Sequence, residues 1–192
     1  MVFPWLGKGE GGIAVIDGSN VVIRNANLGD LARVHEIFNE ILLNATATFE
    51  EHPYTLDSWH QVFESKRKDE LPFFVAEQGS LVIGYGTYGP FRRASGYRVT
   101  VEHSLHVDKK YRGLGVGSLL LKYLIDSAKK KELWAMIAGI DSENRVSLSL
   151  HQKFGFRESG KLENVAEKFS KPLSLTLMKL DLSAGVDVEL KS

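Results

Sequence analysis

The chain has 192 residues, and its 24 Lys and Arg balance 24 Asp and Glu, so a strongly basic nucleic-acid binder is disfavoured. It contains no cysteine, which excludes disulfides, thiol catalysis and zinc–thiolate sites. No apolar run approaches the roughly 18 residues of a membrane span, so we expect a soluble, cytoplasmic protein that binds neither membrane nor nucleic acid.

The first half of the chain predicts two helices and a β-hairpin. Residues 1–20 are rich in glycine, so we expect a flexible extension there. Asn27 and Thr55 are suitable helix N-caps, and apolar residues after Asn27 recur every three or four positions. The expected elements are a strand at 21–24, a helix from Asn27 through Leu42, a loop at 44–53, a helix from Thr55 into the charged run 66–70, and hairpin strands at 73–77 and 81–88.

The second half predicts alternating strands and helices. The expected elements are a loop at 89–96, a strand at 97–107, a helix from 116 into the lysines at 129–131, a strand at 134–140, a helix at 145–154, and strands at 157–165 and 173–182. The first of these helices is expected to bury Val116, Leu119, Leu120, Tyr123, Leu124 and Ser127. No repeat or linker divides this pattern, so we expect one domain at 21–182, followed by a polar tail at 183–192.

The stretch Arg112-Gly-Leu-Gly-Val-Gly117 joins a predicted strand to a predicted helix. Its glycines leave backbone N–H groups uncovered at the positive end of the helix, where those groups have no helical partner. Such a turn favours an anion, above all a phosphate. The spacing matches neither a Walker loop nor the dinucleotide fingerprint. On its own, the stretch also fits a plain strand-to-helix turn.

The same stretch resembles the Arg/Gln-x-x-Gly-x-Gly/Ala signature of the GCN5-related N-acetyltransferases, the GNAT superfamily. Asn144, which opens the next helix, and the ending Leu150-His-Gln-Lys-Phe-Gly-Phe156 are similar to the second signature of that superfamily. The resemblance implies a mixed α/β fold with a mostly antiparallel sheet of about seven strands and about four helices. Two central strands are then expected to splay apart around acetyl-CoA.

Three further segments resemble the phosphinothricin acetyltransferase group within that superfamily. They are Thr100-Val-Glu-His-Ser104, Ala138-Gly-Ile140 and Lys168-Phe-Ser-Lys-Pro-Leu173. This group includes enzymes that acetylate methionine sulfone and methionine sulfoximine, and it is typically dimeric. The resemblance therefore implies a small amino-acid-like acceptor and a homodimer.

The resemblance implies acetyl-CoA as the co-substrate and no metal. The pyrophosphate is expected on the N–H groups of residues 113–118, and the pantetheine arm along residues 105–107, where a backbone N–H would also stabilise the oxyanion. Asn144 is expected to bind the pantetheine, and Arg112 is either a phosphate contact or a solvated side chain. The expected donor-binding residues are Leu105, His106, Val107, Arg112, Gly113, Leu114, Gly115, Val116, Gly117, Ser118 and Asn144.

Two residues are candidates for proton transfer. Glu102 lies in mid-strand, where the family pattern has its general base, and burial would raise its pKa toward neutrality. Its alternative is a residue on the solvent face or in a salt bridge. His151 stands where many members of the superfamily carry a tyrosine that protonates the leaving thiolate. A histidine near a helix end also fits a purely structural role.

The acceptor is expected to contact residues from several loops and from the strand of Glu102. In a regular strand, His106 shares the face of Glu102 and His103 points to the opposite face, which favours a structural role for His103. A guanidinium in the 89–96 loop can bind a carboxylate, a phosphinate or a sulfone, although solvated loop arginines are equally common. The candidate acceptor-site residues are Phe49, Arg92, Arg93, Ala94, Glu102, His103 and Ser104, with Glu50 beside Phe49 and with Lys168 and Lys171 as contributions to a partner subunit.

The sequence therefore predicts an acetyl-CoA-dependent N-acetyltransferase. The acceptor is the α-amine of phosphinothricin, methionine sulfoximine or methionine sulfone, attacked directly in a ternary complex. One alternative is acetylation of a different amine, such as a polyamine, an aminoglycoside or a protein N-terminus. Another is an acyl-CoA-binding sensor without turnover.

Overall fold

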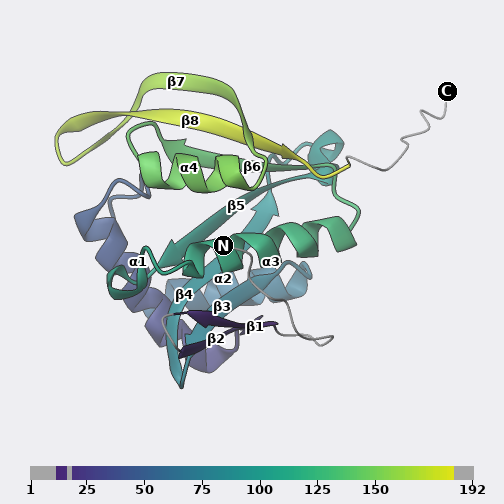
Figure 1. The fold of residues 1–192 in the computed structure, drawn as a ribbon. Helices are drawn as coiled ribbons and strands as arrows, with labels where there is room; N and C mark the ends of the chain where they lie inside the picture. Colours follow the sequence, from purple (N-terminus) through teal and green to yellow (C-terminus); the bar gives the residue numbers. More distant parts are fainter. Residues whose placement is uncertain (1–11, 17–18, 184–192) are drawn as a thin grey trace.

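The computed structural model describes residues 12–16 and 19–183, whose strands form one eight-stranded sheet in the order β1-β2-β3-β4-β5-β6-β8-β7 (Figure 1). All neighbouring strands are antiparallel except β5 and β6, so the expected mixed, mostly antiparallel fold with four helices is confirmed. The strands are β1 Gly12–Ile16, β2 Ser19–Asn25, β3 Phe73–Gln78, β4 Leu81–Pro90, β5 Thr100–Val107, β6 Ala135–Asp141, β7 Arg157–Lys168 and β8 Lys171–Asp181. The helices are α1 Leu31–Asn44, α2 Leu56–Lys68, α3 Val116–Lys130 and α4 Arg145–Lys153.

Strand β1 is the strand that the sequence did not predict. It lies inside the segment 1–20, for which we expected a flexible extension, and it pairs antiparallel with β2, from Gly12 opposite Ile23 to Ile16 opposite Ser19. The apolar run Ile-Ala-Val-Ile, followed in the sequence by Asp17-Gly18, is a pattern typical of a hairpin strand and explains this pairing. Residues 1–11, 17–18 and 184–192, and with them most of the expected extension and tail, lie outside the described residues.

The helices cover both faces of the sheet, with α3 and α4 in front and α1 and α2 behind (Figure 1). The predicted apolar stripe of α1 is buried, and it packs on Trp59 of α2 and Tyr85 of β4. Helix α3 buries Leu120, Leu121, Leu124, Ile125 and Ala128, whereas the expected Leu119, Tyr123 and Ser127 are only half-buried. The buried stripe is displaced because it follows the line of contact with β4, where Gly84 and Gly86 let the leucines approach the backbone.

Two of the expected loops have different bounds in the structure. Strand β5 begins at Thr100 instead of 97, because residues 95–99 form a 3₁₀ turn in which Tyr97 N–H donates to Ala94 O over 2.9 Å. Strands β7 and β8 continue to Lys168 and Lys171, which lie opposite each other. The two residues between them both have positive φ, as in a tight hairpin turn, so these lysines end strands and do not lie in a long loop.

The central strands β5 and β6 splay apart, as expected. Their parallel pairing covers only three positions, from Thr100 opposite Ala135 to Glu102 opposite Ile137. Beyond Glu102, β5 stays paired with β4 as far as Val107, and β6 stays paired with β8. The β6 side of residues 103–107 is therefore left without a neighbouring strand.

Candidate active site

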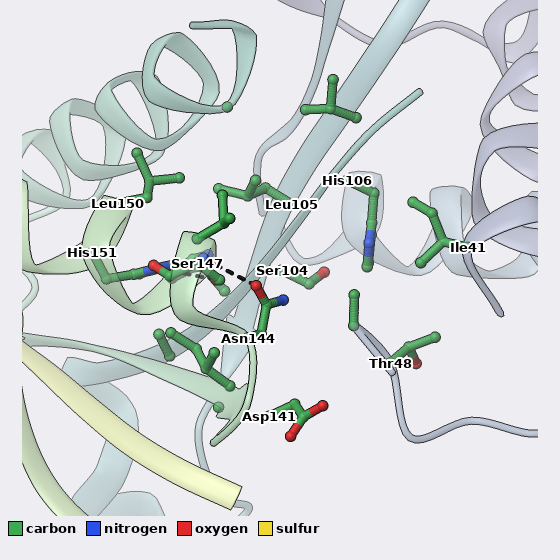
Figure 2. A pocket seen from close by; sticks show the side chains of 18 of the residues that line it. Ile41, Thr48, Ser104, Leu105, His106, Asp141, Asn144, Ser147, Leu150 and His151 are labelled. Carbon is green, nitrogen blue, oxygen red and sulfur yellow. Dashed lines mark hydrogen bonds between the residues drawn. The ribbon is translucent and has the colours of Figure 1, made fainter. Parts of the chain in front are cut away.

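A cleft of about 1850 Å³ opens where β5 and β6 separate. It is lined by the α1–α2 loop, the end of β4, strand β5, the glycine turn, strand β6 and the first turns of α4. Figure 2 shows Ile41 and Thr48 on one side of it and Leu150 and His151 on the other, with Ser104 between them. Residues far apart in the chain thus meet around one space, which is open at the strand edge of β5.

The glycine turn forms one end of the cleft. Gly113 and Gly115 have φ values of 78° and 92°, which glycine adopts without strain. The first helical hydrogen bond of α3 runs from Leu119 N–H to Gly115 O over 3.1 Å, so the N–H groups of residues 116–118 precede the helical ladder. A Cβ on Gly117 would lie 3.5 Å from Leu150, an ordinary van der Waals contact, so α4 lies close to α3 at this point. These features suit a phosphate-bearing ligand.

Not every residue of the turn reaches the cleft. Gly113, Gly115, Gly117 and Ser118 line it. Leu114 is directed to solvent with 38% of its surface exposed, and Val116 is buried in the core between α3 and the sheet. These two residues can contribute only backbone groups to a ligand.

The open edge of β5 presents the backbone of alternate residues. Hydrogen bonds from Phe91 N–H to Thr100 O and from Asp108 N–H to Ile83 O fix the even-numbered residues of β5 as the ones that bond to β4. The backbone groups of His103, Leu105 and Val107 therefore face the splay. Of these, Val107 O already accepts from Arg112 Nε at 3.0 Å. Leu105 is left with both its N–H and its C=O available for a strand-like ligand.

His106 shares the face of Glu102, as expected, but it offers little to a ligand in the cleft. Its backbone is directed to β4, and its ring packs edge-on against Phe38 with centroids 5.6 Å apart. Burial, and secondly the charge of Arg112, lower the pKa of His106 to about 4. The ring is therefore a neutral part of the aromatic cluster under α1.

Arg112 and Asn144 both line the cleft. Besides binding Val107 O, Arg112 donates from Nη2 to Glu40 Oε2 over 3.3 Å, so its guanidinium is engaged within the chain. Asn144 caps α4, because its Oδ1 accepts from Ser147 N–H at 3.1 Å, as the dashed line in Figure 2 marks. Its Nδ2 forms none of the hydrogen bonds found in residues 19–183, and it can donate into the cleft.

Glu102 lies at the point where the two strands separate. It is opposite Gly89 on β4 and Ile137 on β6, and its Oε1 is 3.2 Å from where a Cβ on Gly139 would be. Its carboxylate forms no hydrogen bond or ion pair with any other described residue. Burial raises the pKa of Glu102, and the positive charge of Arg92 partly opposes this rise. Glu102 is thus a free carboxylate with an increased affinity for protons.

His103 and His151 meet on the other side of β5. The β4–β5 register is unbroken, so His103 points away from Glu102, as expected for a regular strand. Its Nε2 lies 3.0 Å from His151 Nε2, while His151 Nδ1 lies 2.7 Å from Ser147 O and must donate to it. In the neutral form His151 Nε2 therefore accepts from His103, and neither ring nitrogen of His151 is left to protonate a ligand. Burial lowers the pKa of both rings, that of His103 to about 3.

The predicted acceptor residues are only partly brought together. Phe49, His103 and Ser104 line the cleft with Glu102. Arg92, Arg93 and Ala94 are exposed and lie outside its lining, with the guanidinium of Arg92 stacked 4.6 Å from the centre of the Phe91 ring. Arg92 is nevertheless close enough to lower the proton affinity of Glu102. Glu50 instead accepts hydrogen bonds from the N–H groups of His52 and Glu51, which lower its pKa.

Lys66 is a cleft residue that the sequence did not predict. Its Nζ donates to Tyr88 O over 2.7 Å and would be 2.9 Å from a Cβ on Gly89, the residue opposite Glu102. The ammonium group therefore fills the space that a side chain at position 89 of β4 would occupy. Burial lowers the pKa of Lys66. Its spacing of seven from Trp59 and three from Phe63 places it on the buried face of α2, and this signal distinguishes it from its charged neighbours.

Within the described ranges 12–16 and 19–183, no three His, Asp or Glu side chains are grouped to hold a metal ion. No helix in this part of the chain is long and apolar enough to cross a membrane.

Known proteins resemble this chain over most of its length. The model of the Acetyltransferase (GNAT) family matches residues 32–156. The L-methionine sulfoximine/L-methionine sulfone acetyltransferase of Pseudomonas aeruginosa is 38% identical over 83% of this chain and 94% of its own. The L-amino acid N-acyltransferase MnaT of Escherichia coli is 38% identical over 83% and 93%. The crystal structure of a GNAT superfamily phosphinothricin acetyltransferase from Sinorhizobium meliloti in complex with acetyl-CoA has a TM-score of 0.83 at 30% identity, over 86% of this chain and 90% of that one.

Proposed function

Since the chain belongs to the GNAT family and is an N-acetyltransferase, we propose that it acetylates the α-amine of a small amino-acid analogue. The acceptors we favour are methionine sulfone, methionine sulfoximine and phosphinothricin, the compounds named for its relatives. The observation that carries this proposal is Glu102, a carboxylate free of partners, with a raised pKa, at the point where β5 and β6 separate.

The donor half of the cleft suits acetyl-CoA, which supplies the acetyl group as a thioester. The N–H groups at the start of α3 are suited to its pyrophosphate, since they lie at the positive end of a helix and have no helical partner. Leu105 would pair with the pantetheine amides like a neighbouring strand. We assign its N–H, or that of Val107, to the oxyanion of the tetrahedral intermediate.

Glu102 acts as the general base. It takes a proton from the α-ammonium of the acceptor, directly or through one water, and the free amine attacks the thioester carbonyl carbon. The nitrogen then loses its second proton to solvent, the C–S bond breaks, and the thiolate of coenzyme A is released. Because the chain has no cysteine, the acetyl group passes directly to the amine without a cysteine thioester. His151 was a candidate acid, but its two hydrogen bonds favour the structural alternative, so we assign the proton of the thiol to solvent.

Two cations beside Glu102 would recognise the acceptor carboxylate. Lys66 donates one N–H to Tyr88 O and keeps two for a ligand, and Arg92 acts on Glu102 from the 89–96 loop. With one carboxylate and one cation in its lining and a second cation, Arg92, outside the lining, this half of the cleft favours a zwitterion that carries its own carboxylate. The same charges oppose a polyamine, and the free carboxylate of Glu102 has no use in a sensor without turnover.

The release of free CoA thiol across a panel of amines tests the function. We expect turnover with methionine sulfone, methionine sulfoximine and phosphinothricin, and little with spermidine, an aminoglycoside or a peptide N-terminus. If acetyl-CoA binds but no amine drives thiol release, the sensor alternative replaces the enzyme. If spermidine exceeds methionine sulfone, the proposed acceptor class is wrong. We also propose a cytoplasmic homodimer, and sedimentation velocity tests its dimeric state.

A further inference from the structure

Lys168, at the end of β7, is a buried cation for which the proposed chemistry has no use. Only 2% of its surface is exposed, and its Nζ donates to Ala45 O and to Thr48 O, both over 2.8 Å. These carbonyls belong to the α1–α2 loop, 123 and 120 positions earlier in the chain. Lys168 therefore joins the β7–β8 hairpin to a loop that lines the cleft.

The physical chemistry of the loop explains why a cation lies there. Ala45 is the residue that caps the C-terminus of α1, where backbone carbonyls lack helical partners and the helix dipole is negative. An ammonium can satisfy two such carbonyls at once, and a buried ammonium requires such partners. The centre of the Phe169 ring lies 5.2 Å from the same Nζ, so the ring forms a cation–π contact with the ammonium group. The contact is thus complete within one chain.

A second contact holds the same loop from β6. The hydroxyl of Thr46 donates to the buried carboxylate of Asp141, the last residue of β6, which is itself held by Glu143 N–H at 3.1 Å. Residues 45–49 all line the cleft, and Figure 2 shows Thr48 across the cleft from Leu150. Strands β6 and β7, which lie on the other side of the gap from β5, therefore determine where this wall of the cleft lies.

We propose that Lys168 is a positioning residue that fixes residues 45–48 as the wall of the acceptor site and thereby controls which acceptors are used. The inference rests on the proposed function for the identity of the acceptor, but not for the contact itself. It gives Lys168 a task within its own chain instead of the contribution to a partner subunit that the sequence suggested. Its neighbour across the hairpin, Lys171, is exposed and lies outside the cleft lining, and its side chain forms no hydrogen bond or ion pair with another described residue. We therefore assign Lys171 neither the contribution to a partner subunit nor a role in its own chain's site, and it serves as a matched control.

The test compares Lys168→Met with Lys171→Met in steady-state kinetics. We expect Lys168→Met to raise the KM of methionine sulfone about tenfold or more, with the KM of acetyl-CoA and kcat within about threefold. Its preference for methionine sulfone over larger and smaller amino acids should also weaken. Lys171→Met should leave all of these unchanged. Lys168→Arg, which keeps the charge and several donors, should restore part of the acceptor affinity.

Hydrogen–deuterium exchange of the segment 44–50 gives a readout that does not need turnover. We expect exchange in this segment to be at least about tenfold faster in Lys168→Met than in Lys171→Met. If the wild type acetylates no acceptor, the proposed function fails while the exchange still decides the role of Lys168. Unchanged exchange together with an unchanged acceptor KM would overturn the positioning role, and so would an equal rise in both KM values. Should Lys168→Met not fold, Lys168→Gln is used in the same comparison.

Discussion

The Nε2 atoms of His103 and His151 lie 3.0 Å apart, and their rings stack with centroids 5.1 Å apart. The bond joins β5 to α4, so it links the strand that carries Glu102 to the helix that Asn144 caps. His103 Nδ1 is buried and has no partner in the described part of the chain. A neutral pair with one proton between the two Nε2 atoms is therefore the form that this packing favours.

Replacing His151 by phenylalanine tests the structural role of this pair. The change leaves the N–H of His103 buried without an acceptor, so we expect a loss of about 1–3 kcal/mol of unfolding free energy. We expect kcat to change less than about threefold, because the ring has no free proton to give. Urea unfolding and thiol-release kinetics measure the two effects. His103→Phe should cost a similar amount, and the double variant less than the sum. A stable His151→Phe enzyme with kcat reduced about 100-fold would instead support His151 as the general acid.

Glu102→Gln tests the general base. The amide cannot accept the proton of the ammonium, so we expect kcat/KM for the acceptor to fall by about 10²–10⁴ near neutral pH. Acetyl-CoA binding, measured by calorimetry, should be unchanged. A base works only when ionised, so wild-type activity should fall as the pH drops through the pKa of Glu102, which burial raises above its usual value. The variant should lack this acidic limb. Full activity in Glu102→Gln would remove this residue from the mechanism.

The local structure to which we assign the donor was predictable because its signals are local in sequence. Three alternating glycines start α3, and Asn144 caps α4 through a residue only three positions away. The backbone groups that β5 leaves open also follow from the regular alternation of residues along the strand. The glycine spacing could not reveal that Leu114 and Val116 point away from the cleft, because their directions depend on how α3 packs on the sheet.

The acceptor half was less predictable because its contacts span long stretches of chain. Lys66 reaches Tyr88 O across 22 positions, and Lys168 reaches the α1–α2 loop across more than a hundred. In sequence, both lysines stand among other charged residues that are exposed. Arg92 and Arg93 carried the expected chemistry, yet they lie outside the cleft lining. Strand β1 was missed because its short apolar run is isolated between glycines, and only its pairing with β2 identifies it as a strand.

Stability at acidic pH should depend on His106. Its pKa is about 4 in the folded chain and about 6.5 when unfolded, so the unfolded chain binds a proton first. The contribution of His106 to the free energy of unfolding is therefore complete above pH 6.5. About 3 kcal/mol of unfolding free energy is lost as the pH falls toward 4. His103 acts in the same direction. Urea unfolding at pH 7 and pH 4.5 should show a smaller pH effect in His106→Phe than in the wild type. Replacing the exposed His52 is the control, and an unchanged pH effect in His106→Phe would contradict this account.

Lys66→Met tests the recognition of the acceptor carboxylate. Losing the cation should raise the KM of methionine sulfone about 10- to 100-fold, with little change in kcat or in the KM of acetyl-CoA. The wild type should prefer methionine sulfone to its methyl ester, and the variant should lose this preference. Lys68→Met, at the exposed end of the same helix, is the control. A variant that keeps its preference for the free acid would show that Lys66 only supports Tyr88.

Gly115→Ala tests the glycine turn as the phosphate site. Gly115 has a φ of 92°, and an added Cβ would meet nothing within 4 Å, so the substitution acts only through the backbone. Holding alanine in this left-handed region costs about 1–2 kcal/mol, and relief of that strain would turn the N–H groups of the turn away from the phosphates. We expect the KM of acetyl-CoA to rise about tenfold, with the acceptor KM unchanged.

Gly79→Ala is a matched control, because Gly79 has a φ of 62°, equally open surroundings and a place in the β3–β4 turn outside the cleft lining. It should lose similar stability and keep its acetyl-CoA affinity. Equal effects of the two changes on the KM of acetyl-CoA would mean that the strain acts through general stability and that the turn does not hold the phosphates.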